Sequence, residues 1–227
     1  MKIIARIYND FKEKFGIPRQ SGILSDFKSK IVFEPEYRVK EALRGIDGYS
    51  HLWLIWEFSE AKRKEFSPTV RPPRLGGNKR MGVFATRSPF RPNPIGLSSV
   101  KLIEIKDTAN EGTVLLVTGA DLLDGTPIYD IKPYLAFTDS HPDAVSGFAE
   151  EVKDYSLDVD FPTSLLNLIS AEKRESLSRL LADDPRPSYI EDGERIYTFA
   201  FAEYEISFKV DKNILTVTDV VKGKNSK

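Results

Sequence analysis

Cysteine is absent from this chain of 227 residues, and histidine occurs only at His51 and His141. Without cysteine, the chain can form no disulfide, no thiolate nucleophile and no cysteine-bound zinc site. Two isolated histidines also argue against a histidine-rich metal site. We therefore expect a protein that binds no metal.

Long apolar runs are also missing. The densest run, residues 52–56, is five residues long, far below the ~18 that a membrane helix needs. Arg6 interrupts the N-terminal apolar stretch before the hydrophobic part of a signal peptide could form. Hydrophobic residues make up 41% and charged residues 30% of the chain, near the average of globular proteins. These values predict a soluble, cytoplasmic protein with no membrane partner.

Familiar catalytic signatures do not occur either. The sequence has no glycine fingerprint that opens a helix, no P-loop, no HExxH motif and no GxSxG motif. A Rossmann-type nucleotide site is therefore unsupported, and loops and strand ends would have to hold any cofactor.

Charge is distributed unevenly along the chain. The net charge is −1, but residues 61–101 hold ten Lys or Arg against one acid, Glu65, for a net charge of +9. Residues 139–194 hold fourteen acids against five bases. A basic block of this kind is a candidate footprint for a polyanion. Charge alone slightly favours the alternative, a solvated loop whose bases pair with the acidic part.

Short apolar segments separated by Gly and Pro predict a β-rich first part of the chain. A helix is expected over residues 36–43, and the segment 51–58 reads as a strand buried on both faces. Residues 66–80 contain too much Pro and Gly for a helix or a paired strand. The expected strands span residues 3–8, 31–33, 51–58, 81–86, 95–105, 114–117 and 128–132. This succession favours a closed or nearly closed β-barrel.

The pattern changes near Ser146. Residues 155–161 alternate between apolar and polar side chains, a helix capped at Thr163 or Ser164 runs to 181, and two strands follow over 196–210 and 214–221. We therefore predict a mainly β protein, α+β overall. Its domains are a barrel-like N-terminal domain (1–145) and a small C-terminal β-α-β-β domain (146–227).

Three segments contain residue types that suit a binding site. In residues 16–23, Pro18 stiffens the chain while Gly22 permits close backbone approach. In residues 82–96, prolines fix the backbone that presents Arg87 and Arg91. Residues 118–130 bring a hydroxyl and the two carboxylates of Asp121 and Asp124 to a turn. Each segment also has a purely structural interpretation. Residues 16–23 could be a surface connection, residues 82–96 a rigid crossover with arginines in solvent, and residues 118–130 a hairpin turn with capping aspartates.

Together, residues 18–20, 48–53, 71–77, 82–96 and 124–134 resemble the TsaA-like or TrmO family. The resemblance covers residues 4–143, and residues 184–189 are similar to the family's C-terminal signature. Members are S-adenosylmethionine-dependent tRNA methyltransferases that methylate N6 of threonylcarbamoyladenosine beside the anticodon. The resemblance therefore implies this activity, S-adenosylmethionine as cofactor, tRNA as partner, a donor-binding β-barrel and a homodimer.

The resemblance also assigns residues to the methyl donor. These are Ser21, Gly22, Ile23, Ser59, Glu60, Arg87, Leu97, Thr118, Gly119, Ala120 and Asp121.

Two further sets of candidates come from the chemistry. Because the carbamoyl group acidifies the N6 proton, a weak base is sufficient, and Asp121, Asp124 or a water are the candidates. The basic block supplies the candidate tRNA contacts Arg71, Arg74, Lys79, Arg80 and Arg91.

Two other functions remain open at this point. The chain could be a non-catalytic RNA-binding module, which would bind tRNA but give no heat with S-adenosylmethionine. It could also methylate a small molecule or a protein, in which case bulk tRNA would not compete.

Overall fold

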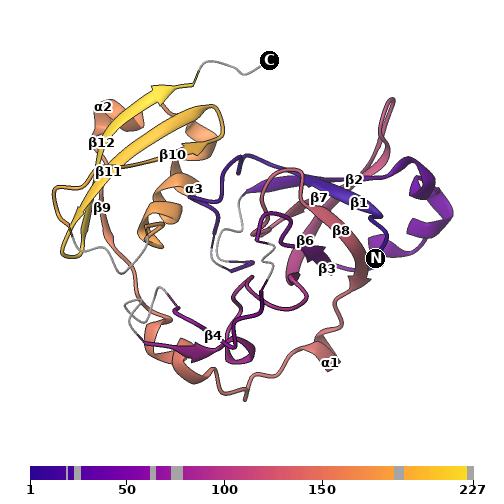
Figure 1. The fold of residues 1–227 in the computed structure, drawn as a ribbon. Helices are drawn as coiled ribbons and strands as arrows, with labels where there is room; N and C mark the ends of the chain where they lie inside the picture. Colours follow the sequence, from indigo (N-terminus) through magenta and orange to yellow (C-terminus); the bar gives the residue numbers. More distant parts are fainter. Residues whose placement is uncertain (19, 23–26, 62–64, 73–78, 187–191, 224–227) are drawn as a thin grey trace.

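The computed structural model describes residues 1–18, 20–22, 27–61, 65–72, 79–186 and 192–223. Two β-sheet units lie side by side, each with its own hydrophobic core (Figure 1). A short third ladder lies apart from both, between β4 (Thr69–Val70) and β5 (Met81–Gly82).

The first unit is a closed six-stranded barrel with strand order β1-β2-β7-β6-β3-β8. Every neighbouring pair is antiparallel, and the pairing of β1 with β8 closes the barrel. Its strands are β1 Ala5–Tyr8, β2 Lys28–Phe33, β3 His51–Glu57, β6 Ile95–Thr108, β7 Gly112–Thr118 and β8 Pro127–Pro133. The predicted barrel is thus confirmed.

Strand β3 shows how the barrel core forms. Leu52, Leu54 and Trp56 alternate inward and are nearly fully buried, because successive side chains of a strand point to opposite faces. The residues between them face outward and are only half-buried. The prediction that this strand is buried on both faces is therefore wrong, because a barrel has one filled side.

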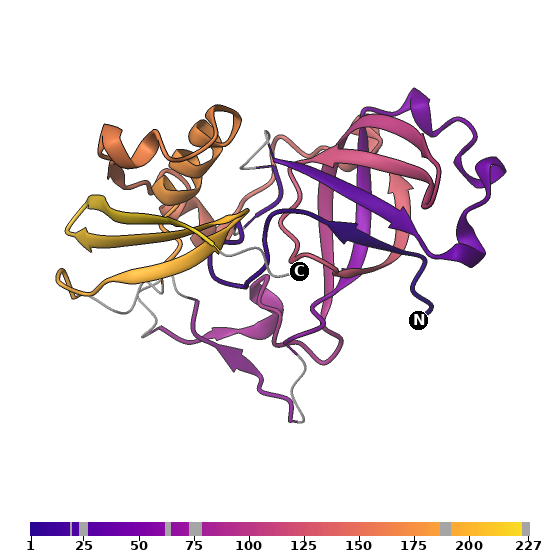
Figure 2. The ribbon, with the colours of Figure 1, turned by 90° about the horizontal axis from the view of Figure 1, so that it is seen from above.

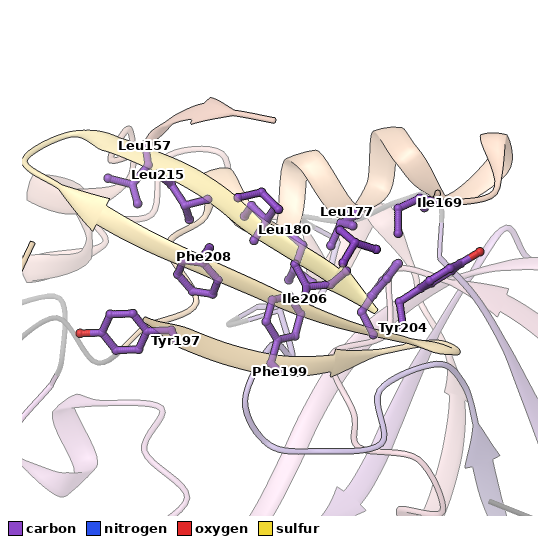
Figure 3. Close-up of a cluster of buried hydrophobic side chains, with 14 of the residues drawn as sticks. Leu157, Ile169, Leu177, Leu180, Tyr197, Phe199, Tyr204, Ile206, Phe208 and Leu215 are labelled. Atoms are coloured by element: carbon purple, nitrogen blue, oxygen red, sulfur yellow. The ribbon is translucent and has the colours of Figure 1, made fainter. Parts of the chain in front are cut away.

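The second unit is a four-stranded sheet with strand order β10-β11-β12-β9, in which β9 runs parallel to β12 (Figures 1 and 3). Helices occupy the crossover from β9, and their apolar residues pack onto the sheet. The elements are β9 Asp158–Asp160, α2 Thr163–Leu166, α3 Ala171–Ala182, β10 Tyr197–Phe201, β11 Tyr204–Asp211 and β12 Ile214–Lys222.

Several predicted elements need correction. The strand expected over 196–210 is the hairpin β10–β11, which turns at Ala202 (φ 52°) and Glu203, with neither Gly nor Pro to mark the turn. The single helix expected up to residue 181 is two helices, and Ser170 precedes the second. The paired residues Thr69–Val70 contradict the expectation for 66–80, since even a proline-rich segment can hold a two-residue ladder.

Short 3-10 turns replace the helix expected over 36–43, and the strand expected over 81–86 ends at Gly82. The remaining short elements are η1 Pro35–Tyr37, η2 Lys40–Leu43, η3 Ile46–Gly48, η5 Val83–Ala85, α1 Ala136–Asp139 and η6 Gly147–Val152. Between the first two turns the backbone leaves the helical region, because Arg38 has φ −78° and ψ 51° and Val39 is extended, so no regular helix forms there.

The hydrophobic cores do not follow the predicted division at residue 146. Phe11 and Phe27 come from the first part of the chain but belong to the core of the C-terminal sheet. Figure 2 shows this N-terminal segment, in indigo, between the barrel and the sheet. The two-domain division stays a prediction, with a segment of the first domain built into the core of the second.

Within the described ranges, no helix is both long enough and apolar enough to cross a membrane.

Candidate active site

Three segments that are distant in sequence meet at the end of β7. The Gly22 N–H donates to the carbonyl of Gly119 at 2.9 Å, and the Ser21 backbone N–H bonds the Asp121 carboxylate. Arg87 donates from Nη1 to Oε1 of Gln20, beside Ser21, at 2.6 Å. We call Ser21, Gly22, Arg87, Gly119 and Asp121 the Asp121 cluster. All five are residues that the resemblance assigns to the methyl donor.

Two glycines allow this meeting of backbones. Gly22 (φ 84°) and Gly119 (φ 82°) both adopt the left-handed conformation that strains other residues. A Cβ on Gly119 would lie 3.4 Å from the nitrogen and Cα of Gly22, whereas a Cβ on Gly22 would meet no atom of the described residues within 4 Å. The cluster is therefore tightly joined on one side of Gly22 and open on the other.

Asp121 sits at the end of a chain of hydrogen bonds that starts in the barrel core. Trp56 Nε1 donates to Ser98 Oγ at 2.9 Å, and Ser98 Oγ donates to Asp121 Oδ1 at 2.5 Å. Burial raises the pKa of Asp121, while the bonds from Ser98 and Ser21 and the positive charge of Arg87 oppose that rise. A fixed carboxylate with a raised pKa suits a proton acceptor.

Arg87 and Arg91 have different surroundings. Arg87 follows the turn η5 and is exposed, so its guanidinium is accessible to an anion. Arg91 donates from Nη1 to the carbonyls of Val83 (3.1 Å) and Thr86 (2.7 Å). Arg91 thus braces its own loop, and its contact with tRNA stays a prediction.

The other predicted donor contacts divide into two groups. Thr118 and Ala120 are buried on either side of Gly119. Leu97, Ser59 and Glu60 are exposed, and among the described residues no hydrogen bond or ion pair joins them to the cluster. Glu60 instead accepts Lys14 Nζ at its carbonyl and its carboxylate. Ile23 lies outside the described residues.

Asp124 holds the N-terminal segment against the barrel. Its Oδ1 accepts the Asn9 N–H at 2.8 Å, its Oδ2 pairs with Lys12 at 2.7 Å, and its own N–H donates to the carbonyl of Phe11. Both carboxylate oxygens are thus engaged in structural bonds. We therefore retain Asp121 and not Asp124 as the candidate base.

The described parts of 65–91, which we call the basic arm, carry the predicted tRNA contacts. Arg71, Lys79 and Arg80 are exposed and have no hydrogen bond or ion pair with other described residues. Arg74 lies outside the described residues. The arm is thus accessible to a polyanion at these three positions.

Sequence reasoning missed two aromatic residues of the basic arm. Phe66 and Phe84 are 57% and 72% exposed, and their rings lie stacked with centroids 6.4 Å apart. The Arg91 guanidinium lies 5.6 Å from the Phe84 ring centre. The available signal was that these aromatic residues alternate with Lys and Arg along the segment, because aromatic side chains stack on unpaired nucleobases.

Comparisons with known proteins agree with this architecture. The tRNA-methyltransferase O N-terminal domain matches residues 6–140, and the TrmO C-terminal domain matches residues 154–223. The chain is 43% identical over 204 residues to the tRNA (adenine(37)-N6)-methyltransferase of Escherichia coli K12, covering 87% of this chain and 86% of the relative. It is 45% identical over 178 residues to the enzyme of that name from Eikenella corrodens, covering 76% and 97%. A crystal structure of TrmO from Pseudomonas aeruginosa superposes with a TM-score of 0.78 at 30% identity, covering 97% of this chain and 95% of that one.

The fold and the cluster define a class: a closed β-barrel with a candidate ligand site at strand ends, joined to a smaller α+β unit. Within that class, both domain matches and the near full-length relatives identify the family. The chain belongs to the TrmO family.

Proposed function

We propose that this chain is an S-adenosylmethionine-dependent methyltransferase that acts on N6 of adenine 37 in tRNA, beside the anticodon. We further propose that the base it methylates carries the threonylcarbamoyl group, and that the protein works in the cytoplasm, where tRNA is modified. The observation that carries the proposal is the meeting of Ser21, Gly22, Arg87, Gly119 and Asp121 at the end of β7. This arrangement occurs in a chain that matches both TrmO domains.

The residues of the Asp121 cluster fit the methyl donor chemically. The exposed Arg87 guanidinium suits the donor's carboxylate, and the Asp121 carboxylate suits its hydroxyl or amino groups. No described residue fills the space beside the Gly22 Cα, and a glycine allows a ligand to approach the backbone closely. S-adenosylmethionine supplies a methyl group bound to a positively charged sulfur. When the methyl group is transferred, the sulfur keeps the electron pair of the broken carbon–sulfur bond.

Asp121 is our candidate for the proton acceptor. Transfer from a sulfonium needs positioning above all, and N6 must also lose a proton. Ser98 and the Ser21 backbone orient the Asp121 carboxylate. The raised pKa of Asp121 makes it a stronger base than an ordinary aspartate.

The basic arm is our candidate for the tRNA contact. Arg71, Lys79 and Arg80 are exposed, as phosphate contacts require, and the Phe66–Phe84 pair offers ring faces to an unstacked nucleobase. RNA-binding proteins recognise loops in this way, by stacking splayed bases on aromatic side chains. The anticodon loop is such a substrate.

We also propose a homodimer that forms across the outer face of β6. Ile95 and Leu97 are 37% and 58% exposed on that face, which is unusual for two neighbouring outward apolar residues in one strand. Replacing Leu97 by Asp should convert a dimer into a monomer in sedimentation velocity. A wild-type protein that sediments as a monomer contradicts this part of the proposal.

The decisive experiment combines purified chain, S-adenosylmethionine and tRNA with or without threonylcarbamoyladenosine, followed by mass spectrometry of the nucleosides. We expect N6 methylation of the carbamoylated form. Binding of tRNA without heat from the donor would favour an RNA-binding module. Methylation of another acceptor that bulk tRNA does not inhibit would favour a different substrate.

A further inference from the structure

The segment that carries the donor residues Ser21 and Gly22 has both of its flanks in the hydrophobic core of the C-terminal sheet. On the upstream side, Phe15 and Ile17 pack against that core. On the downstream side, Phe27 is 6% exposed and belongs to it. Gln20, Ser21 and Gly22 thus emerge from the C-terminal unit and reach across to the barrel.

Gly16 makes the closest of these contacts. It is buried with φ at 90°, and a Cβ built on it would lie 2.4 Å from Cδ2 and 2.7 Å from Cε2 of Phe199. Phe199 is 2% exposed and stands in the middle of β10, where Figure 3 shows it among the core side chains. The ring therefore rests directly on the backbone, five residues before Ser21.

Aromatic contacts hold the two flanks on the same edge of the sheet. The Phe15 ring meets Phe199 edge-on, with centroids 5.7 Å apart. The Phe27 ring meets Phe201, also on β10, at 5.3 Å and Phe11 at 5.1 Å. Both ends of the donor segment are thus fastened to one strand.

Polar contacts fasten the beginning of the segment to the same unit. Lys173 on α3 pairs with Asp10 at 2.5 Å, and the Ala202 N–H at the end of β10 donates to the carbonyl of Asp10 at 3.2 Å. These contacts fix the direction in which the segment leaves the barrel.

We propose that the C-terminal unit positions the donor-binding loop, with Phe199 as the principal positioning residue. This inference rests on the proposed function and assigns a task to the C-terminal unit within it. Fixing a loop costs conformational entropy, and a loop whose flanks are already fixed loses less of it when a ligand binds. The Ser21 and Gly22 backbone groups are thereby held in register with Asp121 and Gly119 before the donor arrives.

The test is Phe199→Ala, studied by calorimetry with S-adenosylmethionine and by steady-state kinetics. We expect the donor Kd and KM to rise by about ten- to a hundredfold, since a loop released from its anchor must be ordered when the donor binds, and this ordering costs conformational entropy. The kcat at saturating donor should change less, and tRNA affinity should stay unchanged. A loss of packing alone would not produce this split.

Leu215→Ala is the matched control. Leu215 is fully buried in the same core but lies on β12, which β11 separates from β10 (Figure 3). The control should lower the thermal midpoint and leave the donor Kd unchanged at temperatures where the protein is folded.

Phe15→Leu provides a milder variant, because Phe15 is only partly buried and the substitution keeps an apolar side chain. It should raise the donor Kd several-fold in a protein that folds. Wild-type donor affinity in folded Phe199→Ala or Phe15→Leu, or an equal loss in Leu215→Ala, overturns the positioning role. Failure of the wild-type chain to bind the donor overturns the proposed function instead.

Discussion

Arg87 owes its accessibility to the residues around it. Arg91 braces the preceding turn through Val83 and Thr86, so Arg87 projects from a fixed backbone. Its guanidinium donates to Gln20. A planar guanidinium held in this way can bind a carboxylate with two parallel hydrogen bonds.

Arg87→Ala should weaken S-adenosylmethionine binding by roughly ten- to a hundredfold, because charge-assisted hydrogen bonds contribute ~1.5–3 kcal/mol each. Arg87→Lys should restore little, since an ammonium cannot reproduce the fork. Isothermal calorimetry measures both. Because Arg87 is exposed, the thermal midpoint should not change. Wild-type donor affinity in Arg87→Ala would show that the donor binds somewhere other than at Arg87.

Asp121→Asn should separate activity from stability. Removal of the proton acceptor should lower kcat by roughly 10²–10⁴-fold. Burial raises the pKa of Asp121 in the folded state, so its contribution to stability is present below the unfolded pKa and is lost as pH rises through the folded value.

The variant should therefore unfold at a higher temperature than wild type near neutral pH. The difference should shrink as the pH falls below the raised pKa of Asp121. Thermal scans at about pH 7 and about pH 4 check the sign, with Asp124→Asn as a control in which structural bonds are lost. A variant that is less stable than wild type at neutral pH contradicts the argument.

Among the elements, the basic arm is built for electrostatic contact. Lys79→Ala and Arg80→Ala should each weaken tRNA binding and reduce the slope of log K against log salt by up to ~1. Donor affinity should stay constant. Arg44→Ala, an exposed arginine just after the turn η2, serves as the control and should leave the slope unchanged. Equal slopes for all variants would instead indicate that the basic arm is a solvated loop that does not contact tRNA.

The barrel strands were predictable because alternation and turn residues are local signals. Leu52, Leu54 and Trp56 mark the inward face of β3 without any knowledge of its neighbours. The β10–β11 turn was missed because Ala202 and Glu203 carry no turn signal, and the backbone there is dictated by pairing across the hairpin. Local patterns predict strands better than they predict where strands reverse.

The candidate site was predictable in part, through the resemblance. It named the residues of the Asp121 cluster, but it could not tell Asp121 from Asp124 as a base. That distinction depends on Asn9 and Lys12, which lie more than 110 positions away in sequence. The bracing role of Arg91 was hidden for a similar reason, since the shape of a turn decides which carbonyls a guanidinium reaches.

At the scale of the whole molecule, the shared segment couples the two units. Phe11 and Phe27 belong to the C-terminal core, while Asn9 and Gly22 bond the barrel. Loss of either core should therefore release the other, so that the chain unfolds in one transition.

Leu215→Ala should make this coupling measurable. A buried Leu→Ala substitution costs about 2–5 kcal/mol. The two tryptophans of the chain, Trp53 and Trp56, both lie on β3 of the barrel. Their fluorescence midpoint should fall together with the far-ultraviolet dichroism midpoint, although Leu215 is in the other unit. Separate midpoints for the two probes would show that the units unfold independently.

The contact between Gly16 and Phe199 also sets an order of events during synthesis. The two residues are 183 positions apart in sequence. At the usual rate of synthesis, Phe199 therefore leaves the ribosome about ten to forty seconds after Gly16. Until then, Phe11, Phe15 and Phe27 have no sheet to cover them. The N-terminal segment can thus pack only after the C-terminal strands have been synthesised. A nascent or prematurely ended chain exposes these aromatic side chains and lacks an ordered donor loop.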